Sequence, residues 1–134
     1  MNLKAEIKKI IPAKYEKFPK LSGGNDYHKN CDNDYHFDKF GQDLYGQECL
    51  YYWFYSKNCA KKNQKRVVLS EVENLVNSCL SKGYFDRNDF NNFCPQTNSA
   101  GPCGFAVIVR ILEYLGIAKY KGFGIVKFNK NNLF

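Results

Sequence analysis

The stretch from Gly101 to Val109 restricts the fold more than any other part of the chain, because it contains almost no polar side chain. A helix that is apolar nearly all round has to be buried on most sides. Pro102 suits the first turn of such a helix, and Gly116 is a suitable end for it. The sequence therefore predicts an internal helix over 102–115. A chain of 134 residues is long enough to build a core around it.

Capping and turn residues divide the rest of the second half into short elements. Ser70 and Glu73 have the spacing of a capping box, and Asp86 is a second good helix start. Gly83 and Pro95 are suitable ends for the two helices that follow these starts. In chain order, the predicted elements are a helix over 71–81, an extended link over 84–85, a helix over 87–93, a loop over 96–101, the helix over 102–115 and a β-hairpin over 117–128.

This order of helix, extended link, two helices and hairpin resembles the winged helix-turn-helix family. The segment from Arg110 to Lys119 is the most informative, because it is similar to a third helix that passes through glycine into the first wing strand. The resemblance covers about residues 69–128. It implies an α+β fold with three helices and a β-hairpin wing. We accordingly divide the chain into an N-terminal extension, 1–62, and a winged-helix module, 63–134.

The N-terminal extension is expected to be mainly helical and rich in aromatic residues. Residues 3–11 predict a short basic helix, which Pro12 stops. Residues 21–43 are rich in Asn and Asp, which favour turns, and therefore predict a polar loop. Apolar side chains in 44–62 recur at helical spacing, which predicts an aromatic helix with a basic last turn.

The net charge of +7 is concentrated in blocks, and two of these blocks point to nucleic acid. One lies at 57–66 and the other in the hairpin. The resemblance implies that the third helix enters the major groove and that the wing touches the backbone or minor groove of DNA. We therefore predict double-stranded DNA as the partner, held mainly through its phosphates. The predicted contacts are Lys57, Lys61, Lys62, Lys65, Arg66, Arg110, Lys119, Lys121, Lys127 and Lys130.

The third helix leaves two other interpretations open. The positions that the family would turn toward the groove are Pro102, Cys103, Gly104, Ala106, Val107 and Arg110. Only Arg110 among them makes strong hydrogen bonds to a base edge. The apolar helix could instead pack on a protein partner or a second copy, as in a phage-type inhibitor that blocks a host nucleic-acid enzyme. It could also be covered by the aromatic segment 44–62 of the same chain, which suits either function.

Three residues in the polar loop have the side chains of a zinc site. His28, Cys31 and His36 lie close together in the sequence, and Cys49 or Cys59 could supply a fourth ligand. Cys94 with Cys103, aided by Cys79, is a second candidate group. The alternative is that the cysteines are small buried residues and the histidines are merely polar. Zinc is therefore a candidate and no cofactor is required. The four aspartates of the loop lack EF-hand spacing; they are Asp26, Asp32, Asp34 and Asp38.

No catalytic residue is predicted. The chain has no glycine-rich phosphate loop, no paired carboxylates and no serine nucleophile elbow, and no histidine follows Cys49 to act as its base. No run approaches the ~20 apolar residues of a membrane span, and the N-terminus has no secretory signal. We therefore expect a cytoplasmic, non-enzymatic DNA-binding regulator whose cysteines are thiols or metal ligands.

Overall fold

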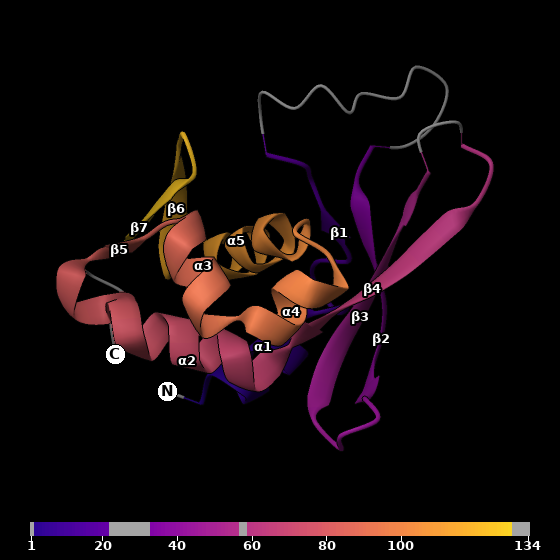
Figure 1. The fold of residues 1–134 in the computed structure, drawn as a ribbon, viewed down its shortest axis with the longest axis horizontal. Coiled ribbons are helices and arrows are strands. Elements are labelled where there is room, and N and C mark those ends of the chain that lie inside the picture. The colour runs from indigo at the N-terminus through magenta and orange to yellow at the C-terminus, as the bar shows by residue number, and fades with distance from the viewer. Residues whose placement is uncertain (1, 22–32, 57–58, 130–134) are drawn as a thin grey trace.

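The computed structural model describes residues 2–21, 33–56 and 59–129, and it confirms the α+β class. The described residues form a four-stranded antiparallel sheet, a small three-stranded sheet and five α-helices (Figure 1). In chain order the elements are α1 (Leu3–Ile10), β1 (Lys17–Phe18), β2 (Tyr35–Gln42), β3 (Glu48–Tyr55), β4 (Lys62–Val68), α2 (Leu69–Cys79), a 3-10 turn (Leu80–Lys82), β5 (Tyr84–Phe85), α3 (Arg87–Phe93), α4 (Pro95–Ala100), α5 (Gly104–Tyr114), β6 (Ala118–Gly122) and β7 (Ile125–Phe128).

The larger sheet has the order β1-β2-β3-β4 and replaces the predicted helix over 44–62. β3 and β4 pair antiparallel along their lengths. Leu50 and Tyr52 are fully buried, whereas Tyr51 and Trp53 are only half-buried, so the side chains alternate between two faces. That period of two belongs to a strand, and the aromatic residues of this segment also favour strands.

The predicted polar loop over 21–43 is wrong for its last part. Residues 35–42 form β2, which pairs with β3 through a bulge between Phe37 and Lys39. Tyr35 is buried, and its ring meets the rings of Tyr52 and Phe54 edge to face. These aromatic contacts across the sheet outweigh the turn preference of the neighbouring Asn and Asp residues. Residues 22–32 lie outside the described residues.

The predicted elements of the second half are confirmed except at two helix starts. α2 begins directly after β4 with Val68 as its N-cap, so the Ser70–Glu73 capping box is wrong. α3 starts as expected, because the carboxylate of Asp86 accepts from the backbone N–H of Asp89 and the two residues form a capping box. The predicted loop over 96–101 is wrong, because Pro95 follows the end of α3, as predicted, but also begins α4.

The extended link and the hairpin join in one small sheet. Its order is β5-β7-β6. The short link β5 therefore pairs with β7 and not with β6, the strand that follows α5. Gly83, in the left-handed region, ends the 3-10 turn before β5. The hairpin β6–β7, here called the wing, projects from one end of the molecule (Figure 1).

Helix α5 lies in the centre of the core, as its apolar sequence predicts. Its buried residues are Gly104, Phe105, Ala106, Val107, Ile108, Val109, Ile111 and Leu112. α5 contacts α4, the wing strand β6 and strands β1 and β4 of the larger sheet. The cover of the helix thus comes from the same chain, although from strands and not from an aromatic helix. The same core includes Leu3 and Ile7 of α1 and Leu75 of α2.

Candidate nucleic-acid interface

One face of the larger sheet carries no described helix. All five helices lie on the other side, where Leu50 and Tyr52 join the core (Figure 1). Strand alternation turns Tyr51, Trp53 and Tyr55 of β3 toward the open side. The pairing of β3 with β2 and β4 adds polar and basic side chains on this side, and the Gln64 amide donates to the carboxylate of Asp38 at the β2 bulge. We call the whole set the open face: His36, Asp38, Lys39, Tyr51, Trp53, Tyr55, Lys62, Gln64 and Arg66.

Trp53 of the open face is in contact with an aromatic ring and with a cation. The His36 ring stacks on it, with centroids 4.2 Å apart and ring planes 15° apart. The Lys62 ammonium lies 4.1 Å from the ring centroid of Trp53, which is a cation–π distance. Tyr55 meets the same ring edge to face at 5.3 Å. This arrangement combines stacked planar groups with an exposed, positively charged side chain.

Tyr51 lies beside this stack and covers Gly41. A Cβ atom added to Gly41 would lie 3.4 Å from the Tyr51 ring, so the ring rests on the bare backbone of β2. The Lys39 ammonium lies 5.5 Å from the centroid of the Tyr51 ring. Arg66 lies opposite Tyr51 in the register of β3 and β4. Aromatic rings on this face therefore alternate with cations.

Asp43, which lines the same hollow as Tyr51, is already engaged. Asp43 lies 3.5 Å from Arg66 and accepts hydrogen bonds from the backbone N–H groups of Tyr45 and Gln47. Burial opposes a low pKa here, but the hydrogen bonds from Gln47 and Tyr45 and the charge of Arg66 lower the pKa of Asp43. The carboxylate is therefore ionised at neutral pH and orders the β2–β3 turn.

Three adjoining hollows follow the edge strand β4 from the open face to the inner side of the sheet. The first, of about 450 Å³, includes Tyr45, Tyr51 and Arg66. The second, of about 290 Å³, shares Tyr51 and Arg66 with the first and adds Lys65 and Ala100. The third, of about 480 Å³, shares Lys65 and Ala100 with the second. Among the described residues that line them, Asp43 is the one acid.

The third hollow is lined by aromatic rings, a thiol and two lysines, Lys20 and Lys65. Phe54 and Tyr35 come from the sheet, and Cys103 comes from the turn before α5. The sulfur of Cys103 lies 3.0 Å from the Tyr52 hydroxyl oxygen. Burial raises the pKa of Cys103, although Tyr52 and Lys65 oppose the shift. Cys103 is therefore a neutral thiol at neutral pH and not an activated nucleophile.

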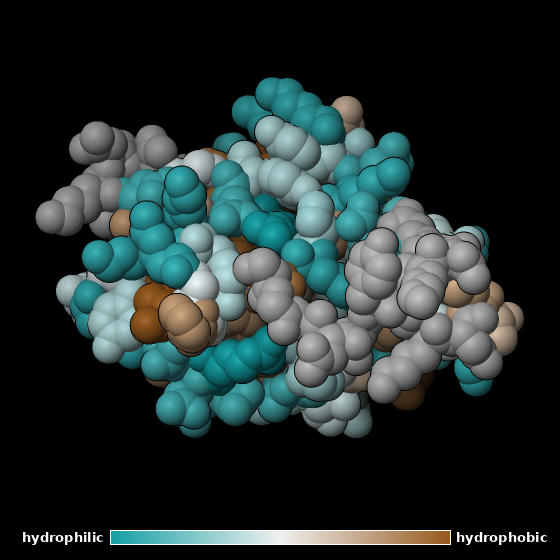
Figure 2. Space-filling model, turned by 90° about the horizontal axis from the view of Figure 1, so that it is seen from above, coloured by the Kyte–Doolittle hydropathy of each residue, from teal (hydrophilic) through white to brown (hydrophobic). Residues whose placement is uncertain are grey.

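The wing carries the other predicted cations. Lys119 of β6 lies directly opposite Lys127 of β7, and both are exposed, as is Lys121. The sequence of the wing, 118–128, contains no acid. Phe123 at its tip is fully exposed and has φ of 54°. Figure 2 views the molecule from the side toward which the wing tip points, and hydrophilic residues dominate this face.

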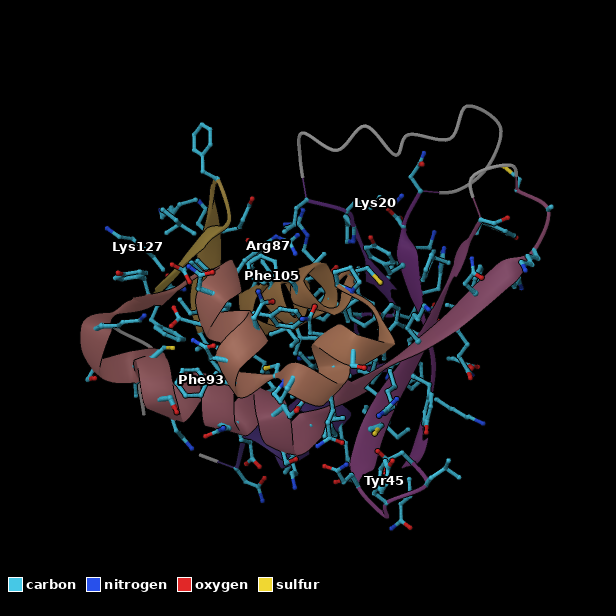
Figure 3. All side chains as sticks on the ribbon, in the orientation of Figure 1. Lys20, Tyr45, Arg87, Phe93, Phe105 and Lys127 are labelled. Carbon is cyan, nitrogen blue, oxygen red and sulfur yellow. The ribbon has the colours of Figure 1, made fainter. Side chains whose placement is uncertain are left out.

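The structure separates the predicted DNA contacts into groups. Lys61 lies just before β4, and Lys62, Lys65 and Arg66 lie within it, so they follow a strand and not a helix. Lys62 and Arg66 belong to the open face, whereas Lys65 turns toward the third hollow. Lys127 and the wing lie toward the opposite end of the long axis from the start of β4 (Figures 1 and 3). Lys57 and Lys130 lie outside the described residues.

The positions of α5 that would face a DNA groove are mostly inside the protein. Gly104, Ala106 and Val107 are buried. The guanidinium of Arg110 donates to the backbone carbonyls of Pro19 and Lys20 at 2.9 and 3.0 Å, and it pairs with Glu113 at 2.7 Å. In this structure, α5 therefore has no face that fits into a major groove, because the chain before β2 lies across it.

The described ligands of the predicted zinc site do not converge. His36 lies opposite Trp53, which is four positions from Cys49 along β3, a separation of roughly 13 Å at ~3.3 Å per residue. Zinc needs ligand atoms ~2.0–2.3 Å from the metal. Cys59, the alternative fourth ligand, is disulfide-bonded. Within the described ranges, no three His, Cys, Asp or Glu side chains are placed to hold a metal. His28 and Cys31 fall outside those ranges.

The second cysteine group is buried and protonated. Burial raises the pKa of Cys79 to about 11, and it raises the pKa of Cys94 still further. The thiol of Cys94 donates to the backbone carbonyl of Glu71. These two cysteines, together with Cys49, are free and buried, which is the alternative that the sequence left open for them.

Comparison of the chain with protein-family models, curated proteins and solved structures finds no match. Within the part of the chain that the structure describes, no helix is long and apolar enough to cross a membrane.

The aromatic half of the open face was missed from the sequence. The helix predicted over 44–62 would carry Tyr51, Trp53 and Tyr55 on one broad apolar surface. The structure instead places these three residues on one side of a strand with His36. The signal that could have found them is the period of two in residues 50–55, in which buried and open side chains alternate.

Proposed function

We propose that the protein binds nucleic acid and that cations of the wing and of β4 hold its phosphates. The observation that supports this most directly is the pair Lys119 and Lys127. Like charges directly opposite each other on neighbouring strands destabilise a sheet. The wing carries no acid that would offset this repulsion. A phosphate backbone offsets it from outside the protein, and each neutralised phosphate also releases counterions.

We further propose that residues 69–128 form a winged helix-turn-helix module in a modified form. The order α2, β5, α3, α5, β6, β7 agrees with the order that the resemblance implies, and α4 is an additional short helix. The pairing of β5 with β7 joins the link to the wing. Because other parts of the chain cover α5, we propose that the wing and β4, and not the third helix, contact the nucleic acid. Such contacts position a protein on DNA without reading its sequence.

The test is the salt dependence of binding. Fluorescence anisotropy of a labelled random duplex is measured at about 50 and 200 mM salt for the wild type and for Lys119→Ala/Lys127→Ala. We expect the double variant to bind every duplex more weakly and to flatten the slope of log affinity against log salt by up to ~2 units. The matched control is Lys9→Ala/Lys14→Ala, which removes the same charge from exposed positions in and after α1.

Two outcomes would overturn the proposal. One is a wild-type protein without salt-sensitive binding to any nucleic acid at low ionic strength. The other is a control variant that weakens binding as much as the wing variant, because the effect would then come from net charge and not from the wing.

A protein partner is the second candidate function, and exposed apolar residues at the β2–β3 turn favour it. Leu44 is fully exposed and Tyr45 is 79% exposed. Figure 3 shows Tyr45 at the tip of this turn, far from the wing. Large apolar side chains in such a place suit a contact with another protein or a second copy. Sedimentation equilibrium of the wild type and of Leu44→Ser/Tyr45→Ser tests the second copy, and salt-insensitive self-association lost in the variant would support it.

A further inference from the structure

The open face presents aromatic surface in a form that phosphate binding alone does not require. His36 and Trp53 are stacked at 4.2 Å, and the Lys62 ammonium lies over the Trp53 ring at 4.1 Å. Lys62 is exposed, so its long side chain can swing away at little cost. A nucleobase in its place would extend the stack, while the ammonium would be released toward a phosphate. Tyr51 offers a second ring, which lies over Gly41.

The hollows along β4 provide a path for a flexible strand. Each shares two residues with the next, so they lead continuously from Tyr51 and Arg66, past Lys65, to Phe54 and Cys103. Rings and cations occur in all of this path, and the one acid among its described residues, Asp43, is held by Arg66 and Gln47. Proteins that bind single strands combine a basic groove with rings on which successive bases stack.

A duplex does not fit this path, because its bases are already stacked on one another and paired. Only unpaired bases can turn their flat faces toward rings on a sheet. The path also winds round the edge of the sheet from one face to the other, which a stiff double helix cannot follow. DNA stays straight over distances far longer than this protein.

We infer that the open face and the edge of β4 bind an unpaired segment of nucleic acid, with bases stacked at Trp53 and Tyr51 and phosphates held by Lys62, Lys65 and Arg66. The inference rests on the proposed nucleic-acid binding and names its substrate class. DNA and RNA share the chemistry that these groups recognise, so both are compared in the test.

Trp53 is the only tryptophan of the chain, so its fluorescence reports on the open face without a label. The full-length protein is titrated with oligothymidylate and oligouridylate of about 15 nucleotides, and with a random duplex of the same length. Saturable quenching of Trp53 by at least one single strand, and none by the duplex, is the expected result. A stronger response to one of the two strands identifies the preferred sugar.

The matched variants change one ring at a time. Tyr51→Leu keeps apolar volume but removes the stacking surface, and it leaves Trp53 as the reporter. We expect its affinity for the single strand to fall about 5- to 150-fold, the range for losing one stacked base, while its duplex binding through the wing is unchanged. Tyr15→Leu removes an exposed tyrosine that stacks on Tyr114, away from β3 and β4, and should bind like the wild type.

The outcomes separate this inference from the proposed function. If duplex and single strand bind with equal affinity and Trp53 does not respond, the inference is wrong and the proposed function stands. If no nucleic acid binds, both are wrong. If Tyr51→Leu fails to fold, as judged by circular dichroism, the decision rests on whether the single strand protects wild-type Trp53 from acrylamide quenching. Absence of protection refutes the inference.

Discussion

Glu71 is a buried carboxylate that joins α2 to α4, the helix that packs against the edge strand β4. Its replacement tests how strongly this carboxylate stabilises α4. The side chain is 7% exposed. Oε2 accepts from the backbone N–H of Gln96 at 2.9 Å. Oε1 accepts from the backbone N–H of Thr97 at 2.8 Å and from the Thr97 hydroxyl at 2.7 Å. The carboxylate thus serves as the cap that α4 lacks in its own sequence, and its charge faces the positive end of the helix.

The magnitude follows from the number of donors that lose a partner. In Glu71→Gln, the amide oxygen can keep one pair of bonds, but the NH₂ group cannot accept from the remaining donor. A hydrogen bond to a charged group is worth ~1.5–3 kcal/mol, and the change also removes a charge at a helix end worth ~0.3–1 kcal/mol. We expect Glu71→Gln to cost about 2–4 kcal/mol. Glu71→Ala, which strands all three donors, should cost about 4–5 kcal/mol.

Urea unfolding followed by circular dichroism measures the free energy of unfolding of both variants. Glu73→Gln is the matched control, because Glu73 lies two positions further along α2 and makes a partly exposed ion pair with Lys4 at 3.7 Å. That pair should contribute no more than ~1 kcal/mol. If Glu71→Gln costs less than about 1 kcal/mol, or no more than the control, the carboxylate does not cap α4 in solution.

Three other changes test the core and one ion pair. Leu112→Ala should lower the free energy of unfolding by about 2–5 kcal/mol in urea, because Leu112 is fully buried, and a loss below ~1 kcal/mol would contradict its burial. Gly104→Ala should cost about 1–3 kcal/mol in the same assay, because its Cβ would lie 2.6 Å from Cγ2 of Thr97; an unchanged midpoint would contradict this close approach. Burial opposes a low pKa at Asp89, but hydrogen bonds from Lys82 and Asp86 lower its pKa below 3.8, so its stabilisation is present above about pH 4 and is lost as pH falls through the lowered pKa. Asp89→Asn should therefore lower the melting temperature at pH 7 and much less at pH 3, and equal losses at both would refute the linkage.

Helix ends were predictable where one local signal had one meaning. Asp86 caps α3 as predicted, because its carboxylate accepts from the backbone N–H of Asp89, three residues later in the sequence. Pro95 has two meanings, since proline is common both after a helix and at the first position of one. The structure shows both, because α3 ends at Phe93 and Glu71 supplies acceptors for the N-terminus of α4 from another helix. That acceptor is invisible in the local sequence.

The central strand β3 shows how a helix and a strand can share one pattern. Leu50, Trp53 and Phe54 have helical spacing, whereas Leu50, Tyr52 and Phe54 have the spacing of a strand. A short apolar run does not decide between the two periods. The aromatic content favours a strand, and pairing with both neighbouring strands then buries Leu50 and Tyr52. The charge pattern alone identified the basic residues near β4 as candidate contacts. Only the register between β3 and β4 shows which of them lie on each face of the sheet.

The side chain of Arg110 joins the two halves of the chain. It is the one residue of α5 that could have read a base, yet its guanidinium binds the carbonyls of Pro19 and Lys20, directly after β1. Tyr114, one turn later on the same helix, donates its hydroxyl to the carbonyl of Lys17 at 2.6 Å. Both side chains therefore hold the first strand of the larger sheet across the helix. A helix used in this way organises the core, and the surface left for the proposed nucleic acid is the one that the sheet and the wing provide.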